Sequence, residues 1–384
     1  MSALNFDLED YYLDNKQHLP RHIRSVFTQV DDLTAYWLKR GATEVGKSAL
    51  GRPILAYSCG NGPTHVLVWA QMHGNESTGQ RAFTWFLHLH EKESWLLSSF
   101  TIAFIPLLNP DGALLFQRRN ALGIDLNRDA RAQQTPEIKA LVAFARRFNP
   151  KFAFNLHDQR SIFTAESHKR GAALSLAIPN VLPTIENHKY IESNRNLLRT
   201  MVAKAVGSLS KETQTLITQF DESYYPTALG EYFQEQGIST LLIESGMLGL
   251  DFNRNISTAI CSHFLHLLFR QTLSINLLES NTIVNMNLSP SLSNLRDVLC
   301  RNVKCKLGAS VITCDFSFQY LPQKENGICQ HRLYCDDIGD LRHLNGRIEP
   351  VQLELDMSNF QIEIGKPVIN DLCQSVKAVW PTEV

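Results

Sequence analysis

The sequence has little of what marks secreted, membrane-spanning or nucleic-acid-binding proteins. Eight cysteines among 384 residues are too few for a disulfide scaffold. No run approaches the roughly 18 apolar residues of a membrane span, and the N-terminal sequence lacks the basic and apolar regions of a secretory signal. The 37 basic and 38 acidic side chains give a formal net charge of -1, which provides no positive excess for a nucleic acid. We therefore expect a cytoplasmic protein without a membrane or nucleic-acid partner.

The cysteines are unevenly distributed, and none of them belongs to a C-x-x-C pair. Because cysteines paired at short spacing are typical of structural zinc sites, we expect buried free thiols near the C-terminus rather than a second zinc site. Six of the eight lie within the last 85 residues: Cys300, Cys305, Cys314, Cys329, Cys335 and Cys373.

Chain length and residue pattern predict two domains. A single core rarely grows beyond about 250 to 300 residues, so a chain of 384 residues suggests one large domain and a small one. From about residue 64 to 273, short β-branched runs alternate with longer helical patterns, which is typical of an α/β layer structure. After about residue 280, alternating apolar and polar residues with turn signals predict a β-rich domain. The expected domains are residues 1–278 and 279–384.

Individual elements follow from the same periodicities. Strands are expected at 64–70, 100–107, 151–156 and 238–243, and helices at 30–40, 77–90, 136–148, 194–206, 228–236 and 256–273. The helix at 136–148 has the clearest start, with Thr135 as N-cap, Pro136 at the first helical position and Glu137 in the first turn. In the C-terminal part, alternating segments are expected at 309–320, 350–356 and 359–365.

Three of the expected strands end at residues that can bind a metal. His73 and Glu76 follow the first strand, His157 follows the third and Glu244 follows the fourth. Because ligands of an open α/β sheet gather beyond the carboxyl ends of its strands, we expect these side chains at one rim. A catalytic zinc requires three nitrogen or oxygen ligands and a fourth position for water. We predict that His73, Glu76 and His157 hold one Zn²⁺ and that Glu244 is the general base.

The spacing of the first two ligands supports this prediction. His73 and Glu76 are three residues apart, so a strand-to-helix turn can direct both side chains toward one ion. Gly74 and Gly79 are expected to ease the backbone of that turn.

A polar segment lies between the ligand residues. Asn109-Pro-Asp-Gly112 predicts a turn, and residues 118–129 are expected to form a loop that is rich in Arg, Asn and Asp. Beside a metal, guanidinium groups can bind anions, because they form two parallel hydrogen bonds to a terminal carboxylate or stabilise an oxyanion.

Taken in order, five motifs resemble those of the zinc carboxypeptidases of the M14 type. They lie between about residues 50 and 270 and read His73-Gly-Asn-Glu76, Asn109-Pro-Asp-Gly112, Gly123-Ile-Asp-Leu-Asn-Arg128, Asn155-Leu-His157 and Glu244-Ser-Gly246. The resemblance implies a mixed β-sheet flanked by helices. It also implies zinc-dependent hydrolysis of the C-terminal amide bond of a peptide, or of a small amide with a free carboxylate.

The resemblance assigns the metal centre residue by residue. His73, Glu76 and His157 match the zinc ligands, and Glu244 matches the general base. Asp125 matches the acid that orients the first ligand histidine.

It also assigns residues that contact the substrate. Asn127 and Arg128 match the pair that holds the substrate's C-terminal carboxylate. Arg118 matches the arginine that polarises the scissile carbonyl, and its neighbour Arg119 is the alternative if the motif is shifted by one residue.

The tyrosine that caps the substrate in this family is expected upstream of the general base. Tyr224 and Tyr225 lie in the right region, where either can cap the substrate or pack against its neighbours. Three acids occur nearby and would favour a basic side chain on the substrate if they line the pocket, but they would otherwise be solvated surface: Asp221, Glu222 and Glu231.

The chain departs from the digestive carboxypeptidases at several positions. The interval between Glu76 and His157 is shorter, which implies that substrate-lining loops are trimmed. Asn75 stands where digestive members carry an arginine, and Asp129 follows the Asn-Arg pair where an Asn-aromatic sequence is usual. These differences bear on side-chain specificity rather than on hydrolysis.

Three other functions share parts of this pattern. An N-acyl amino acid deacylase of the aspartoacylase and succinylglutamate desuccinylase type has the same scaffold, the H-x-x-E element and an Asn-Arg carboxylate grip. A murein-peptide carboxypeptidase would act on peptides of the cell wall. A zinc-free binding module would keep the fold with a ligand or the base substituted, but all four residues are present here.

Overall fold

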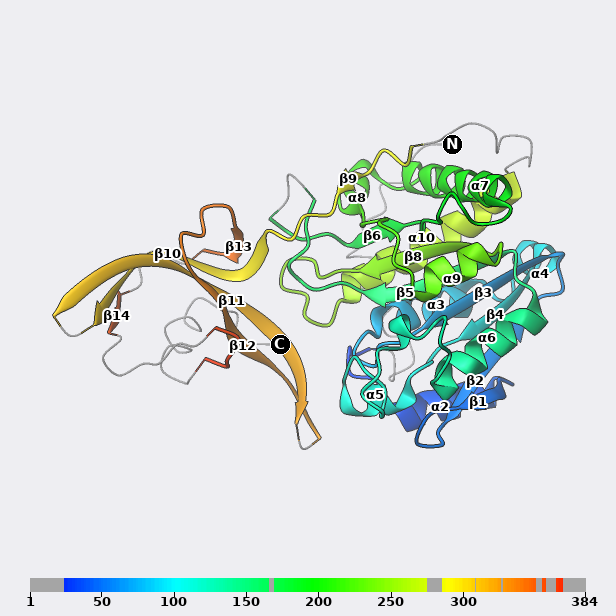
Figure 1. Ribbon diagram of the computed structural model, residues 1–384, viewed down its shortest axis with the longest axis horizontal. Coiled ribbons are helices and arrows are strands. Elements are labelled where there is room, and N and C mark those ends of the chain that lie inside the picture. The colour runs from blue at the N-terminus through cyan, green and yellow to red at the C-terminus, as the bar shows by residue number, and fades with distance from the viewer. Residues whose placement is uncertain are drawn as a thin grey trace. The chain divides into compact units, whose positions relative to one another are not determined.

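The computed structural model describes residues 24–165, 169–274, 285–307, 309–325, 327–349, 354–356 and 364–368. The chain forms two compact units (Figure 1). The first comprises Met1–Gln159, Ala172–Gly246 and Asn253–Ser291, and the second comprises Arg160–Gly171, Met247–Phe252 and Leu292–Val384. The domain boundary expected at residue 278 lies outside the described residues. Within the described ranges, no helix is long and apolar enough to cross a membrane.

The first unit is built on a nine-stranded sheet. Its strands are β1 (Thr43–Lys47), β2 (Pro53–Cys59), β3 (Thr64–Ala70), β4 (Phe100–Ile105), β5 (Phe152–Asp158), β6 (Leu174–Ala177), β7 (Ile217–Gln219), β8 (Ser239–Ser245) and β9 (Ser289–Pro290). Their order in the sheet is β1-β2-β4-β3-β5-β8-β6-β7-β9. The central strands β4, β3, β5 and β8 are parallel, whereas β2 joins β4 and β6 joins β8 in antiparallel fashion. This mixed sheet confirms the expected fold class.

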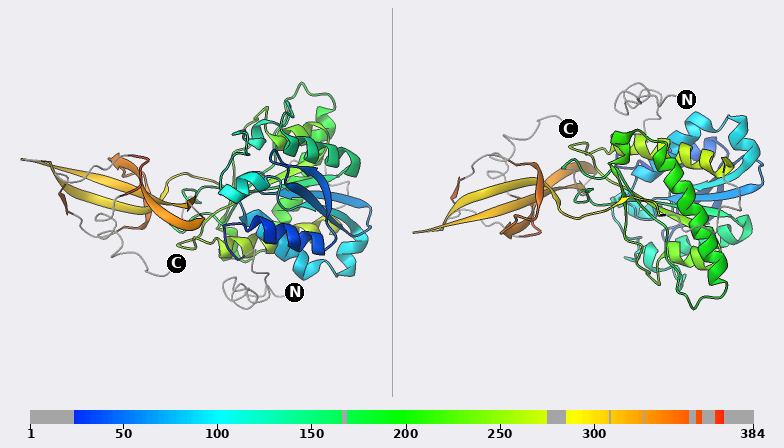
Figure 2. Two further views of the ribbon diagram at one scale, coloured as in Figure 1. Left: turned by 90° about the horizontal axis from the view of Figure 1, so that it is seen from below. Right: turned by 90° about the horizontal axis from the view of Figure 1, so that it is seen from above.

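Helices flank the sheet (Figure 2). They are α2 (Val30–Lys39), α3 (Thr78–His90), α4 (Ser94–Ser99), α5 (Pro110–Leu115), α6 (Pro136–Phe148), α7 (His188–Gly207), α8 (Lys211–Gln214), α9 (Leu229–Glu235) and α10 (Asn255–Ser274), with a 3-10 turn, η3, at Leu126–Arg128. The helix α6 begins as the sequence predicts, because the Thr135 side chain accepts a hydrogen bond from Ile138 N and Pro136 stands at the start.

The core lies on both faces of the central strands. On one face, Phe233 of α9 packs edge to face against Trp69 of β3, with ring centroids 5.4 Å apart, and Leu141 of α6 belongs to the same buried cluster. On the other face, Phe83 of α3 lies 4.7 Å from Phe104 of β4 between ring centroids. Alternate residues of a strand point to opposite faces, so helices are needed on both sides to bury the sheet. The ends of the strands are not covered by this packing.

One predicted turn is wrong. The segment from Asn109 is not a free turn but the start of α5, because the Asn109 side chain accepts a hydrogen bond from Gly112 N at 2.9 Å and Pro110 stands at the first helical position. The motif therefore caps a short helix. The strands β1, β2, β6, β7 and β9 were not predicted, since they are short or carry no strong alternation.

The second unit is a small sheet. Its strands are β10 (Leu295–Leu307), β11 (Ser310–Glu325), β12 (Ile328–Gly339), β13 (Asn345–Ile348) and β14 (Glu354–Asp356). They run in the order β12-β11-β10-β13, and β14 pairs with β10. Buried free thiols of the core are Cys300, Cys305 and Cys335, whereas Cys314 is half-buried and Cys329 is exposed. Cys373, residues 350–353 and residues 359–363 of the expected strands lie outside the described residues.

Two loops that follow strands of the first unit belong to the second unit. Arg160–Gly171 follows β5 and Met247–Phe252 follows β8. The guanidinium of Arg347 donates one hydrogen bond to a carbonyl group in each loop, at 2.6 and 3.0 Å. It also pairs with Asp297 at 2.8 Å, and the two side chains are only 2% and 0% exposed. Since a buried charge is costly without a partner, this pair holds both loops to the β-rich core.

Candidate metal centre

The sheet order brings the predicted ligands together. His73 and Glu76 lie in the turn between β3 and α3, and His157 lies near the end of β5, the parallel neighbour of β3. Glu244 lies on β8, where it is the register partner of His157. The three adjacent parallel strands therefore place these four residues at the same rim of the sheet.

The turn that carries two of the ligands has an unusual backbone. Gln71, just after β3, has a φ of 53°, which is uncommon for a residue other than glycine. The turn then closes with a hydrogen bond from Glu76 N to His73 O at 3.0 Å. Gly74 serves a different purpose from the one expected, because a Cβ there would lie 2.0 Å from the carbonyl carbon of Gly112. It allows two backbones to approach rather than adopting a positive φ.

The second glycine also provides space. Gly79 belongs to α3, and a Cβ on it would lie 2.4 Å from the Cβ of Leu156 on β5. The glycine therefore lets the helix pack closely on the strand that carries His157.

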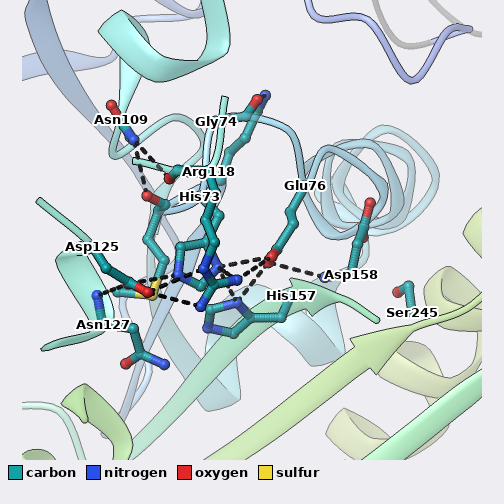
Figure 3. A network of polar contacts seen from close by, with 12 residues as sticks. His73, Gly74, Glu76, Asn109, Arg118, Asp125, Asn127, His157, Asp158 and Ser245 are labelled. Carbon is teal, nitrogen blue, oxygen red and sulfur yellow. Dashed lines mark hydrogen bonds and ion pairs between the residues drawn. The ribbon is translucent and has the colours of Figure 1, made fainter. Parts of the chain in front are cut away.

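The donor atoms of the three predicted ligands converge (Figure 3). Nδ1 of His73 lies 2.8 Å from Oε1 of Glu76, and Nδ1 of His157 lies 2.7 Å from Oε2 of the same carboxylate. The two Nδ1 atoms are 3.1 Å apart. All three side chains are buried. They form the one group of His, Cys, Asp or Glu in the described ranges that could hold a metal ion.

Asp125 and Arg118 surround the ligands from the loop before η3. Asp125 Oδ1 accepts a hydrogen bond from Nε2 of His73 at 3.0 Å, and its Oδ2 lies 3.0 Å from the guanidinium of Arg118. One guanidinium nitrogen of Arg118 also lies 3.0 Å from Glu76 Oε1 and 3.2 Å from His73 Nδ1. Arg119 instead donates to the carbonyl of Gly123 in an exposed position, so Arg118 is the arginine at this centre.

These donors fit a zinc ion. In the neutral form of His73, donation from Nε2 to Asp125 leaves Nδ1 as an acceptor, which is the form that binds a metal. Zinc takes such nitrogen and oxygen ligands at about 2.0 to 2.2 Å, so tetrahedral donors lie roughly 3.3 Å from one another. The three donors here lie within 4.8 Å of one another, and they already attract the cationic guanidinium of Arg118. The site therefore has the chemistry and size for zinc.

Charges within the centre shift the pKa values of its members. Burial would lower the pKa of His73, but Glu76 and the hydrogen bond to Asp125 outweigh it and raise this pKa to about 9. For Glu76, the two histidines overcome burial and hold the pKa well below its usual value. Burial prevails for His157 and lowers its pKa despite the negative charge of Glu76. The centre thus stabilises a negative carboxylate that attracts a cation.

Glu244 has the properties of a proton carrier. Burial, and then the negative charge of Glu76, raise the pKa of Glu244 to about 8. A divalent cation between the two carboxylates would lower that pKa, because it stabilises the ionised form. A carboxylate whose pKa is raised toward neutrality both accepts and returns protons efficiently.

The predicted substrate residues lie next to the centre. Asn127, shown beside Asp125 in Figure 3, donates its backbone N–H to that carboxylate at 2.9 Å, and its side-chain oxygen accepts from Leu229 N at 3.0 Å. The guanidinium of Arg128 lies 4.1 Å from the ring centroid of Tyr225. Stacking on an aromatic ring orients the planar donor fork of an arginine.

The two candidate tyrosines have different environments. Tyr224 donates its hydroxyl to Glu235 at 2.9 Å and accepts from Arg131 at 2.8 Å, so it belongs to a structural network. Tyr225 is 47% exposed and stacks with Arg128. Tyr225 is therefore the more accessible of the two candidates.

The three nearby acids also differ. Asp221 binds the backbone and hydroxyl of Ser223 on the surface, and Glu222 pairs with Arg199 at 3.1 Å. Glu231 is 8% exposed and accepts from the backbone N–H of Tyr225 at 3.2 Å.

Sequence reasoning missed two features of this region. Asp129 is buried and accepts hydrogen bonds from the backbone and the hydroxyl of Thr135, so it braces the start of α6 rather than contacting a substrate. Gln71 was not singled out, although its buried amide donates to Gly74 O at 2.9 Å inside the ligand turn. The only sequence signal for Gln71 was its place as a polar residue directly after the apolar strand β3.

The chain is similar to known carboxypeptidases in sequence. Residues 41–230 match the family model described as zinc carboxypeptidase. The chain is 33% identical over 150 residues to a protein named carboxypeptidase 2 from Trichophyton tonsurans, an alignment that covers 36% of this chain and 27% of that protein. It is 38% identical over 100 residues to a carboxypeptidase 2 from Trichophyton rubrum, which covers 24% of this chain and 18% of that protein. The chain thus spans about a quarter of the length of these relatives, or less.

A solved structure shares the fold. The carboxypeptidase A from Helicoverpa armigera superposes with a TM-score of 0.50 at 16% identity, covering 70% of this chain and 80% of that one. The nine-stranded mixed sheet with flanking helices is therefore the carboxypeptidase architecture.

Proposed function

We propose that the chain hydrolyses the C-terminal amide bond of peptides with a free carboxylate, because residues 41–230 match the model of the zinc carboxypeptidase family. The observation that carries the proposal is the convergence of His73, Glu76 and His157 on one point, with Glu244 beside them on the next strand.

The chain's own residues divide the work of hydrolysis. When bound by the three ligands, zinc supplies Lewis-acid chemistry to a carbonyl group and to water. Glu244 takes a proton from the attacking water onto its carboxylate and returns it to the departing amine nitrogen. Arg118, whose guanidinium already reaches the donor cluster, donates a hydrogen bond to the carbonyl oxygen as negative charge develops on it.

A second group of residues selects the end of the peptide. Arg128 offers a planar fork of N–H donors that matches a carboxylate, and the ring of Tyr225 holds that fork in place. The side-chain oxygen of Asn127 is engaged with α9, so its amide NH₂ is the part that donates to the substrate. Fixing the terminal carboxylate in this way limits cleavage to the last residue.

Products from a substrate panel test this proposal. Zinc-loaded protein is incubated with free-acid peptides, their C-terminal amides, N-acyl amino acids and murein peptides, and products are identified by mass spectrometry. We expect single residues to be released from free-acid peptides alone, and no release by Glu244→Gln. Cleavage of only N-acyl amino acids would move the protein to the deacylase function, and cleavage of only murein peptides would narrow the substrate to the cell wall. Turnover of none of them would refute the proposed activity.

A further inference from the structure

The ligand turn depends on contacts from outside its own strand and helix. We define it as residues 71–77, which connect β3 to α3 and contain both His73 and Glu76. It is neither helix nor strand, and it begins with the strained backbone of Gln71. A non-glycine residue with this φ persists only where the surrounding structure holds it.

Three consecutive residues near the N-terminus contact this region. Thr28 accepts a hydrogen bond from Nε2 of Gln71 at 2.7 Å, at the start of the ligand turn. The carbonyl of Val26 accepts from the hydroxyl of Ser77 at 2.7 Å, at its end. Between them, Phe27 packs against Phe116, with ring centroids 4.6 Å apart.

Each contact bears on a part of the metal centre. The amide of Gln71 that bonds to Thr28 also donates to Gly74 O, next to His73. Ser77 directly follows the ligand Glu76, and Phe116 lies two residues before Arg118. Residues 26–28 therefore contact both ends of the ligand turn and, through Phe116, the segment that leads to Arg118.

The same three residues are themselves firmly held. Val26, Phe27 and Thr28 are 5%, 8% and 3% exposed. They lie before the region that matches the zinc carboxypeptidase model, which begins at residue 41. The contacts are thus a feature of this chain that the match does not include.

We propose that residues 26–28 form a positioning clamp that sets the geometry of the ligand turn and thereby the zinc affinity. The inference rests on the proposed zinc site. Removing the Thr28 hydroxyl leaves a buried N–H of Gln71 without its acceptor. The amide then shifts, and with it Gly74 O and the direction of His73.

Zinc affinity measured by competition with a chromophoric chelator tests the clamp. We expect Thr28→Val to raise the zinc dissociation constant on the order of tenfold, which is the low end of the effect for residues that orient metal ligands. Thr28→Ser keeps the hydroxyl and should keep the wild-type dissociation constant. The matched control is Thr200→Val, which removes a buried hydroxyl that donates to Asn196 O within α7. This control should lower the melting temperature without changing zinc affinity.

Other outcomes are informative as well. An unchanged zinc dissociation constant in Thr28→Val, or an equal change in Thr200→Val, would overturn the clamp. If Thr28→Val does not fold, Ser77→Ala removes the other hydrogen bond to the clamp and must weaken zinc binding for the inference to stand. Because the assay measures metal binding, a loss of zinc affinity in the variants supports the clamp whether or not the protein cleaves peptides. If the wild-type protein cleaves none of the peptides, only the proposed activity is refuted.

Discussion

Replacing Asp125 by asparagine tests whether this carboxylate sets the chemistry of the metal centre. Its Oδ1 accepts from Nε2 of His73 at 3.0 Å and from the backbone N–H of Asn127 at 2.9 Å. Its Oδ2 accepts from Arg118 at 3.0 Å. All three partners are donors, whereas an asparagine of the same shape offers one oxygen and one NH₂ group.

Both orientations of the asparagine are unfavourable. With NH₂ toward Arg118, donors face one another and the guanidinium loses its charged partner. With NH₂ toward His73, the ring must accept at Nε2, so its Nδ1 carries the proton and no longer offers a lone pair to a metal. Loss of such a supporting partner lowers metal affinity by about 10- to 100-fold, which corresponds to about 1.4 to 2.7 kcal/mol.

The assay is competition for zinc with a chromophoric chelator, together with the melting temperature. Asp111→Asn is the matched control, because this buried carboxylate binds Arg52 and Leu50 N rather than a predicted metal ligand. We expect weaker zinc binding for Asp125→Asn alone, while both variants lose stability. An unchanged dissociation constant for Asp125→Asn, or an equal loss for Asp111→Asn, would refute the reasoning.

Three further predictions concern catalysis and stability. Glu244→Gln keeps the shape but cannot carry a proton, so it should lower kcat by about 10²- to 10⁴-fold in peptide assays while zinc still binds. Arg347→Met removes the positive charge that pairs with the buried Asp297 and should destabilise the second unit by about 3 to 5 kcal/mol in chemical denaturation. Burial, and then the charge of His90, lower the pKa of His266 to about 4, below its unfolded value of about 6.5. The unfolded chain therefore binds more protons between these values, and stability is lost as the pH falls from about 6.5 toward 4. His266→Gln should reduce this acid-induced loss of melting temperature.

Each of these has a control and a contradicting result. A Glu244→Gln variant as active as the wild type would exclude that carboxylate as the base. Arg342→Met breaks a surface pair with Asp340, and a loss from Arg347→Met no larger than this one would argue against the buried pair. His343→Gln changes an exposed histidine, and an acid profile of His266→Gln equal to that of this control would contradict the assignment.

The sequence predicted the centre of the fold better than its edges. The strand 64–70 and the helix 136–148 match β3 and α6 residue for residue, because a continuous apolar run and a capped amphipathic pattern are strong local signals. The edge strand β1 and the short strand β7 were missed, since strands of three to five residues carry little periodicity. Asn109-Pro-Asp-Gly112 can start a helix or make a turn, and local sequence does not decide between them.

The sequence predicted which residues form the site, but not the tertiary contacts that hold them in place. His73, Glu76 and His157 lie at the carboxyl ends of strands that become neighbours, so the α/β layer rule suffices to group them. The positive φ of Gln71 and the hydrogen bond from its side chain to Thr28 depend on tertiary contacts, which no spacing in the sequence reveals. The catalytic and binding roles of the predicted site residues, like the cytoplasmic location, stay predictions.

The division into domains stays a prediction, because the expected boundary at residue 278 lies outside the described residues. The second unit includes Arg160–Gly171 and Met247–Phe252 in addition to the C-terminal segment. Arg347, which pairs with the buried Asp297, donates a hydrogen bond to each of these two loops, which are distant in sequence from the C-terminal segment.

Titration of metal-free protein with zinc, while the release of a C-terminal residue from a free-acid peptide is followed, tests the central claim most directly. The account predicts that activity rises linearly and stops rising at one zinc per chain. It also predicts that His157→Ala shows no such rise over the same range. Hydrolysis that needs no metal, or an unchanged titration in His157→Ala, would contradict the account.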